Sequence, residues 1–132
     1  MEPRIYKVFC YGTLKSNHPR SMTASYPTAK FLTKYFLRNH TLYKMPFRDA
    51  PVMVPKLDSV VIGEIYAVDE STLKKLDERE GVHTGWYTRE YIKELDVYVY
   101  MWKHSVVFFK HIGPAFYKNE NKKWGFLKWL IK

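Results

Sequence analysis

The sequence has few of the features that mark secreted or membrane proteins. Cys10 is its single cysteine, so the chain forms no internal disulfide and a reducing compartment is expected. Charges interrupt the N-terminal stretch, which lacks the apolar core of a signal peptide, and no apolar run reaches a membrane-spanning length. These absences predict a soluble, cytoplasmic protein without a membrane partner.

The motifs of several enzyme classes are also missing. The five histidines are dispersed and form no His-x-x-x-His pair or Cys/His cluster, so we expect no metal site. The chain has no Gly-x-Ser-x-Gly nucleophile elbow and no phosphate-binding Gly-rich motif. Cys10 lies in an apolar stretch, which favours a buried, unreactive thiol over a nucleophile. Carboxylates are the remaining candidates for chemistry.

Negative charge is scarce, with 13 Asp and Glu against 22 Lys and Arg and a formal net charge of +9. Such an excess is compatible with a nucleic acid, an anionic surface or an acidic substrate. The basic residues are spread along the chain without a block of five or six. This spread favours a general positive field over a dedicated nucleic-acid patch, so we do not expect a nucleic-acid partner.

The composition is that of a folded domain. Hydrophobic residues make up 46% of the chain and aromatic residues 17%, which argues against disorder. The length suits a single domain over residues 1–132, and no repeat or linker divides it. The many tyrosines and phenylalanines favour strands over helices.

Most of the predicted elements are strands. The strand patterns cover residues 5–11, 59–68, 86–95, 97–103 and 105–111, with a short one at 52–54. Residues 30–45 mix helical and strand periodicity, and their part 38–43 favours a strand. A helical turn is expected within residues 20–26. The basic, tryptophan-containing tail, residues 119–132, is interpreted as a helix or strand docked on its own core, with a membrane-surface or partner helix as the alternative.

One helix stands out in the pattern, over residues 69–81. Leu73 and Leu76 share one face, which predicts that this face packs into the core. Asp69 precedes the run as an N-cap, and Gly81 follows at a position where helices commonly end. The helix is therefore delimited at both ends by residues of the expected type.

Glu80 is the main candidate for a functional carboxylate. It lies on the leucine face in the last helical turn, where the helix dipole favours cations. Periodicity alone leaves a functional residue and a structural brace both open. Asp77, on the same face, is interpreted as a brace for a neighbouring loop. Glu64 is interpreted as a solvated strand residue, beside Gly63 at a bulge or close approach.

Two motifs occur in a fixed order. Residues 9–15 read Phe-Cys-Tyr-Gly-Thr-Leu-Lys, and residues 61–91 contain Gly-Glu-Ile-Tyr, Leu-Asp-x-x-Glu-Gly and Tyr-x-Arg. At this spacing the pair resembles the γ-glutamylcyclotransferase-like family, which includes γ-glutamylamine cyclotransferases and proteins of the avirulence-induced-gene type. The resemblance implies a small mixed α+β fold, with a barrel-like sheet and one or two short helices around a central cavity.

The resemblance also implies roles for individual residues. Glu80 matches the catalytic glutamate. The other matching positions are Tyr11, Gly12, Thr13 and Leu14 in the loop that holds the glutamyl moiety, Tyr87 as an aromatic near the site, and Arg89 as a structural residue. A Gly-led loop after a strand has free backbone N–H groups, which can hold a carboxylate or an oxyanion.

The implied reaction is the release of 5-oxoproline from a small γ-glutamyl compound, with Glu80 as general acid and base and without metal or organic cofactor. Tyr-Gly-Thr-Leu-Lys is closer to the γ-glutamylamine branch than to the dipeptide or glutathione branches. The alternatives are a non-catalytic small-ligand module and a charge-based interaction module on the same fold. The leaving group and the oligomeric state stay open.

Overall fold

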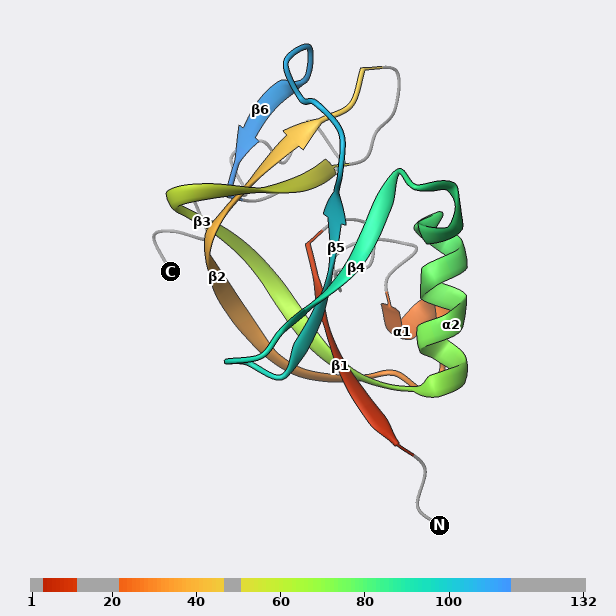
Figure 1. Ribbon diagram of the computed structural model, residues 1–132. Helices are drawn as coiled ribbons and strands as arrows, with labels where there is room; N and C mark the ends of the chain where they lie inside the picture. Colours follow the sequence, from red (N-terminus) through yellow and green to blue (C-terminus); the bar gives the residue numbers. More distant parts are fainter. Residues whose placement is uncertain (1–3, 12–21, 47–50, 115–132) are drawn as a thin grey trace.

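The computed structural model describes residues 4–11, 22–46 and 51–114 (Figure 1). In chain order the elements are β1 (Ile5–Cys10), α1 (Met22–Ser25), β2 (Lys30–Lys44), β3 (Pro51–Asp69), α2 (Glu70–Arg79), the 3-10 turn η1 (Val82–Thr84), β4 (Tyr87–Ile92), β5 (Val97–Trp102) and β6 (Lys110–Gly113). None of the helices in this described part is long and apolar enough to cross a bilayer.

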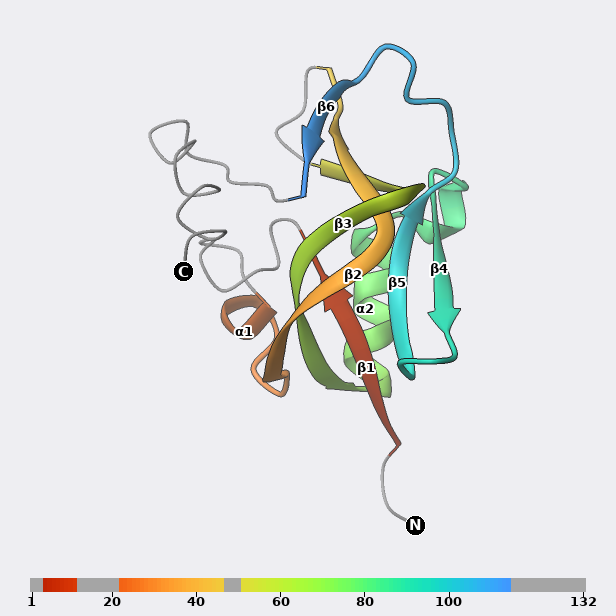
Figure 2. The same ribbon diagram turned by 90° about the vertical axis from the view of Figure 1, so that its left-hand side faces the viewer.

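The strands form one six-stranded sheet in the order β4-β5-β1-β3-β2-β6. Neighbours pair antiparallel except β1 and β5, which run parallel. The long β2–β3 hairpin curves strongly around the rest of the sheet (Figures 1 and 2). The predicted α+β class with few short helices is confirmed. Within residues 4–11, 22–46 and 51–114, β4 and β6 remain the two edges, so the curved sheet does not close into a barrel.

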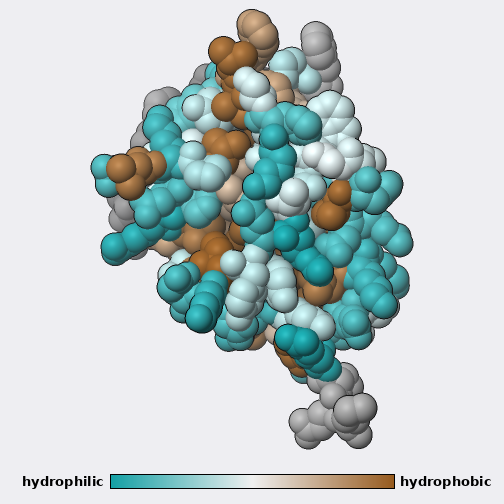
Figure 3. All heavy atoms as spheres, viewed as in Figure 1, coloured by the Kyte–Doolittle hydropathy of each residue, from teal (hydrophilic) through white to brown (hydrophobic). Residues whose placement is uncertain are grey.

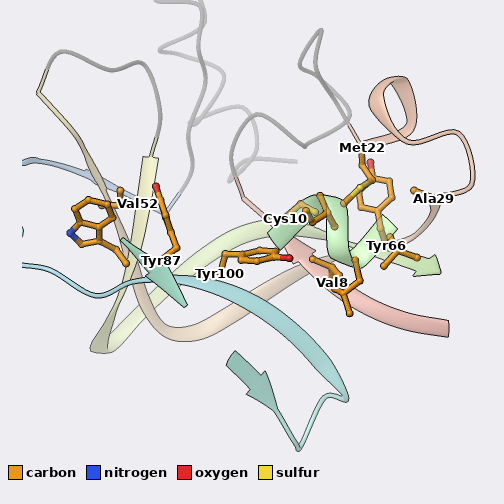
Figure 4. Close-up of a cluster of buried hydrophobic side chains, with 12 residues drawn as sticks. Val8, Cys10, Met22, Ala29, Val52, Tyr66, Tyr87 and Tyr100 are labelled. Atoms are coloured by element: carbon orange, nitrogen blue, oxygen red, sulfur yellow. The ribbon is translucent and has the colours of Figure 1, made fainter. Parts of the chain in front are cut away.

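Side chains from the two faces of the sheet form two hydrophobic clusters. Because side chains alternate along a strand, β1 sends Val8 and Cys10 to one cluster and Phe9 to the other. The first, here called the helix-side cluster, is drawn in Figure 4. Its members are Val8, Cys10, Met22, Ala29, Val52, Tyr66, Val68, Leu73, Leu76, Tyr87, Tyr100 and Trp102.

Helix α2 is held by its apolar face and by its ends. Leu73 and Leu76 are buried in the helix-side cluster, and burying one such side chain contributes roughly 1.5–3 kcal/mol. At the start, Asp69 Oδ1 accepts a 2.8 Å hydrogen bond from the Thr72 backbone N–H. At the end, Gly81 adopts φ 66°, the left-handed conformation that glycine favours. The prediction of a helix over residues 69–81 is confirmed.

Two segment predictions need correction or refinement. Residues 30–36, whose pattern was ambiguous, belong to a single strand, β2, which pairs with β3 along almost its whole length. Register shifts near Phe31 and Arg38 disturb the alternation and explain the mixed periodicity. The predicted strand at 105–111 is wrong for its first part, because only Lys110–Gly113 forms β6. The tail, residues 119–132, lies outside the described residues.

The surface is mostly hydrophilic on the face seen in Figure 3, with hydrophobic side chains in small separate areas. Among the described residues, the most exposed large apolar side chains are Phe108 at 88%, Leu57 at 77% and Val107 at 74%. Exposed apolar side chains are normal for a globular protein. On the face seen in Figure 3, the hydrophobic areas are separate and do not form one extended apolar surface.

Candidate active site

Glu80 is the C-cap residue that directly follows α2. It has a helical backbone conformation as the C-cap, and its N–H donates a 2.9 Å hydrogen bond to the Leu76 carbonyl oxygen. Its side chain is half-buried. The negative charge of Glu80 raises the pKa of Cys10, Tyr11 and Tyr100. The carboxylate therefore lies close to groups from the end of β1 and from β5.

Tyr11 directly follows β1 and is 7% exposed. Its hydroxyl donates a 2.6 Å hydrogen bond to the Tyr100 carbonyl oxygen, and a hydrogen bond with the Met53 backbone also stabilises the phenolic oxygen. Burial raises the pKa of Tyr11, and the nearby Glu80 and Tyr87 raise it further. Tyr11 is thus a neutral, firmly held residue at neutral pH.

The three residues after Tyr11 were predicted to bind the glutamyl moiety. These residues, Gly12, Thr13 and Leu14, lie outside the described residues. Their structural role stays a prediction, and the anchored Tyr11 marks the point at which this segment begins.

Tyr87 is the first residue of β4 and is 8% exposed. Its ring meets the Trp102 ring edge-on, with centroids 5.2 Å apart. It belongs to the helix-side cluster together with Cys10 and Tyr100, all labelled in Figure 4. The structure therefore brings Tyr87, Tyr11 and Glu80 together from three separate elements.

Asp77 connects α2 to two strands. The Tyr100 hydroxyl donates a 2.7 Å hydrogen bond to Asp77 Oδ1, and Arg89 Nη1 lies 3.4 Å from Asp77 Oδ2. The Arg89 guanidinium also lies over the Tyr98 ring, 4.9 Å from its centroid. The expected bracing role of Asp77 is present, but its partners are strands β4 and β5 and not a neighbouring loop.

Glu64 was predicted to be solvated, and this prediction is wrong. The residue is 3% exposed and lies opposite Cys10 in the β1–β3 pairing. The Tyr66 hydroxyl donates a 3.2 Å hydrogen bond to Glu64 Oε1. Strand β3 is central in the sheet and covered on both faces, a position that a nearly continuous apolar run such as 59–68 indicates.

Gly63 permits the close approach of β3 to β1 that places Glu64 beside Cys10. A methyl group at this position would collide with the Cys10 carbonyl oxygen and with the Phe9 ring. The close approach expected at Gly63 is therefore confirmed.

Cys10 is a buried thiol whose pKa is affected by two carboxylates. It is 2% exposed. Burial is the main cause of the raised pKa of Cys10, and the charges of Glu64 and Glu80 raise it further. A thiol of this kind stays protonated at neutral pH, as expected for an unreactive cysteine.

Among these residues, Glu80 is the candidate for proton transfer. The Glu80 carboxylate can accept and return a proton, and its neighbours Tyr11, Tyr100 and Cys10 are neutral. Residues 4–11, 22–46 and 51–114 contain no group of three or more His, Cys, Asp or Glu side chains placed to hold a metal ion.

Known proteins with similar sequences and folds identify the family. The sequence model of the family described as "Gamma-glutamyl cyclotransferase, AIG2-like" matches residues 8–124. A relative in Methanocaldococcus jannaschii, named "Putative gamma-glutamylcyclotransferase MJ1514", is 32% identical over 109 residues, which are 74% of this chain and 85% of the relative.

Two solved structures show the same fold. The protein ytfP of Escherichia coli is 27% identical and superposes with a TM-score of 0.66 over 83% of this chain and 93% of its own. An aig2-like protein from Mus musculus is 23% identical, with a TM-score of 0.68 over 89% of this chain and 99% of its own. The expected γ-glutamylcyclotransferase-type enzyme is thus confirmed at the level of family and fold. The chain belongs to the γ-glutamyl cyclotransferase, AIG2-like family.

Proposed function

We propose that this protein releases 5-oxoproline from a γ-glutamylamine, with Glu80 as the general acid and base. The observation that supports this most is the position of Glu80. Glu80 is the C-cap residue of α2, and its negative charge raises the pKa of Tyr11. Tyr11 is the first residue of the predicted glutamyl-binding segment. Membership of the γ-glutamyl cyclotransferase, AIG2-like family supports the reaction class.

The proposed reaction begins with loss of a proton from the substrate. An ammonium is not a nucleophile, so the Glu80 carboxylate takes one proton from the α-ammonium. The resulting amine attacks the γ-carbonyl carbon of the same molecule, and the new C–N bond closes a five-membered ring. Because the attack is intramolecular, the enzyme mainly has to hold the glutamyl chain in a folded conformation.

The second step releases the leaving group. The tetrahedral oxyanion collapses, the bond from the former γ-carbonyl carbon to the departing nitrogen breaks, and Glu80 returns its proton to that nitrogen. The ring nitrogen still carries an extra proton from the attack; the Glu80 carboxylate takes this second proton and passes it to the released amine. The products are 5-oxoproline and an ammonium ion, and Glu80 is again a carboxylate. One residue serves all the proton transfers, so the cycle requires no other acid or base.

The substrate-binding part of the proposal concerns the segment after β1. We propose that backbone groups of Gly12, Thr13 and Leu14 hold the glutamyl moiety and stabilise the oxyanion. The buried, hydrogen-bonded Tyr11 supports this, because it fixes the start of the segment. Tyr87 is proposed as a wall of the site, supported by its burial and its electrostatic coupling to Tyr11.

We also propose that the chain forms a single domain and that the protein is located in the cytoplasm.

A 5-oxoproline release assay tests the function. The panel contains small γ-glutamylamines, an ε-lysine isopeptide, γ-glutamyl dipeptides and glutathione. Glu80→Gln keeps the shape of the side chain but removes the proton acceptor, so turnover should fall by at least about 10²-fold. Glu78→Gln is the matched control, since Glu78 lies exposed on the same helix. It should leave the rate unchanged.

Two outcomes would contradict the proposal. Normal turnover by Glu80→Gln would show that Glu80 is a structural brace. Saturable binding of an intact γ-glutamyl compound, without 5-oxoproline release by the folded wild-type protein, would instead identify a non-catalytic ligand module on this fold.

A further inference from the structure

Tyr100 contacts the two parts of the chain that carry the candidate site, helix α2 and the end of β1. It lies in β5 and is 3% exposed. Its side-chain hydroxyl donates a 2.7 Å hydrogen bond to Asp77 in α2. Its backbone carbonyl oxygen accepts the 2.6 Å hydrogen bond from the Tyr11 hydroxyl. One residue therefore joins the helix that ends in Glu80 to the end of β1.

The contact with α2 is close to Glu80. Asp77 precedes Glu80 by three residues, about 4.5 Å along the helix axis, and lies on the same face. Arg89 holds the second oxygen of Asp77 from β4, at 3.4 Å. The Asp77 carboxylate thus links the last turn of α2 to strands β4 and β5. These contacts limit rotation and displacement of the end of the helix.

The Tyr100 hydroxyl is a dependable donor. Burial raises the pKa of Tyr100 well above its usual range, and the hydrogen bond and negative charge of Asp77 raise it further. The negative charge of Glu80 also raises the pKa of Tyr100, and the positive charge of Arg89 lowers it. The phenol is therefore neutral throughout the pH range in which a carboxylate base works.

We propose that Tyr100 is a positioning residue that sets the place of the Glu80 carboxylate relative to Tyr11 and the bound glutamyl moiety. This inference rests on the proposed role of Glu80. The Tyr100 hydroxyl contacts Asp77, and the Tyr100 backbone carbonyl contacts Tyr11, so a substitution can remove the first contact and keep the second. Tyr100→Phe removes the hydrogen bond to Asp77 and keeps the ring and the carbonyl that accepts from Tyr11. A misplacement of about 1 Å in a catalytic group can cost about 10²-fold in rate.

The test compares Tyr100→Phe with Tyr98→Phe. Tyr98 lies two residues earlier on the same strand, and no described residue hydrogen-bonds its hydroxyl, so the control removes the same atom without the contact. Tyr100→Phe should lower kcat by about tenfold or more and change KM by less than about twofold. It should also move the acidic limb of the kcat–pH profile, which reports the acid and base in the bound complex. Tyr98→Phe should leave both quantities unchanged.

A structural measurement separates this inference from the proposed reaction. Hydrogen–deuterium exchange at the amides of Glu80 and Gly81 should be faster in Tyr100→Phe and unchanged in Tyr98→Phe. Unchanged exchange in Tyr100→Phe would overturn the inference whether or not the wild type turns over γ-glutamyl compounds. Wild-type kcat and pH profile in an active Tyr100→Phe enzyme would overturn it too. A wild type that is inactive, with faster exchange in Tyr100→Phe, would overturn only the proposed reaction.

Discussion

Replacing Gly63 with alanine tests how closely β3 must approach β1. The added methyl group would meet the Cys10 carbonyl oxygen and two atoms of the Phe9 ring. All three distances are shorter than those that a side-chain Cβ atom normally has to a non-bonded atom. The Phe9 ring can rotate away, but the Cys10 backbone pairs with Glu64, the neighbour of Gly63. Relief of this contact therefore requires the two strands to separate.

The expected loss of stability follows from two opposing terms. Overpacking in a well-packed core costs about 1–3 kcal/mol. Alanine also reduces the conformational entropy of the unfolded chain, which returns about 0.4–1 kcal/mol where the backbone conformation suits it. Gly63 has no positive φ, so this gain applies. Because one of the contacts is with the Cys10 backbone, the overpacking cost should lie in the upper part of its range, about 2–3 kcal/mol. The net loss is then about 1–2.6 kcal/mol, or roughly 4–9 °C in Tm for a domain of this size.

Urea unfolding of Gly63→Ala measures this loss, and a double-mutant cycle locates its cause. Phe9→Leu by itself should destabilise the protein, because it shortens a buried side chain. In the Gly63→Ala background it should recover part of the loss, because it removes the ring contacts while leaving the Cys10 contact. Wild-type stability of Gly63→Ala would refute the close-approach argument, and strict additivity in the cycle would refute the role of the Phe9 ring.

Two other predictions concern titratable groups. The pKa of Asp69 is lowered from its ordinary value of 3.8, chiefly by the hydrogen bond from the Thr72 backbone. The charged cap therefore stabilises the fold above that value, and this stabilisation is lost as the pH falls through the lower folded-state pKa. Urea unfolding should accordingly show that the free energy of unfolding falls less between about pH 7 and about pH 3 in Asp69→Asn than in the wild type. An equal fall in both proteins would contradict the capping role of the charged Asp69. Cys10, buried and with a raised pKa, should resist a thiol reagent in the native protein and react fully in urea; rapid native labelling would contradict its burial.

Helix α2 was predictable because its signals are local. The N-cap Asp69, the leucine face and Gly81 all lie within a few turns of one another, and each acts on the backbone next to it. Glu80 could be selected as a candidate for the same reason, since the helical repeat alone placed it on the leucine face. The two family motifs then directed attention to Tyr11 and Tyr87, which also lie in the folded core.

Strand boundaries were less predictable because a strand exists only with its partner. Residues 30–36 carry both periodicities, and their pairing with β3 makes them part of β2. Residues 105–109 have the composition of a strand but form a turn closed by the hydrogen bond from the Phe109 N–H to the Val106 carbonyl oxygen, 2.8 Å. β-Propensity describes how well a residue suits a pleated surface and does not supply that surface.

The sequence by itself determined the α+β class, the helix that carries Glu80 and the family, because periodicity, capping residues and motif spacing are properties of neighbouring residues. Only the tertiary structure decided that Glu64 is buried and that Tyr100 joins α2 to the end of β1. Tyr100 is 23 residues from Asp77 and 89 residues from Tyr11 in the chain. Contacts across such separations depend on the order of strands in the sheet, which no local pattern encodes.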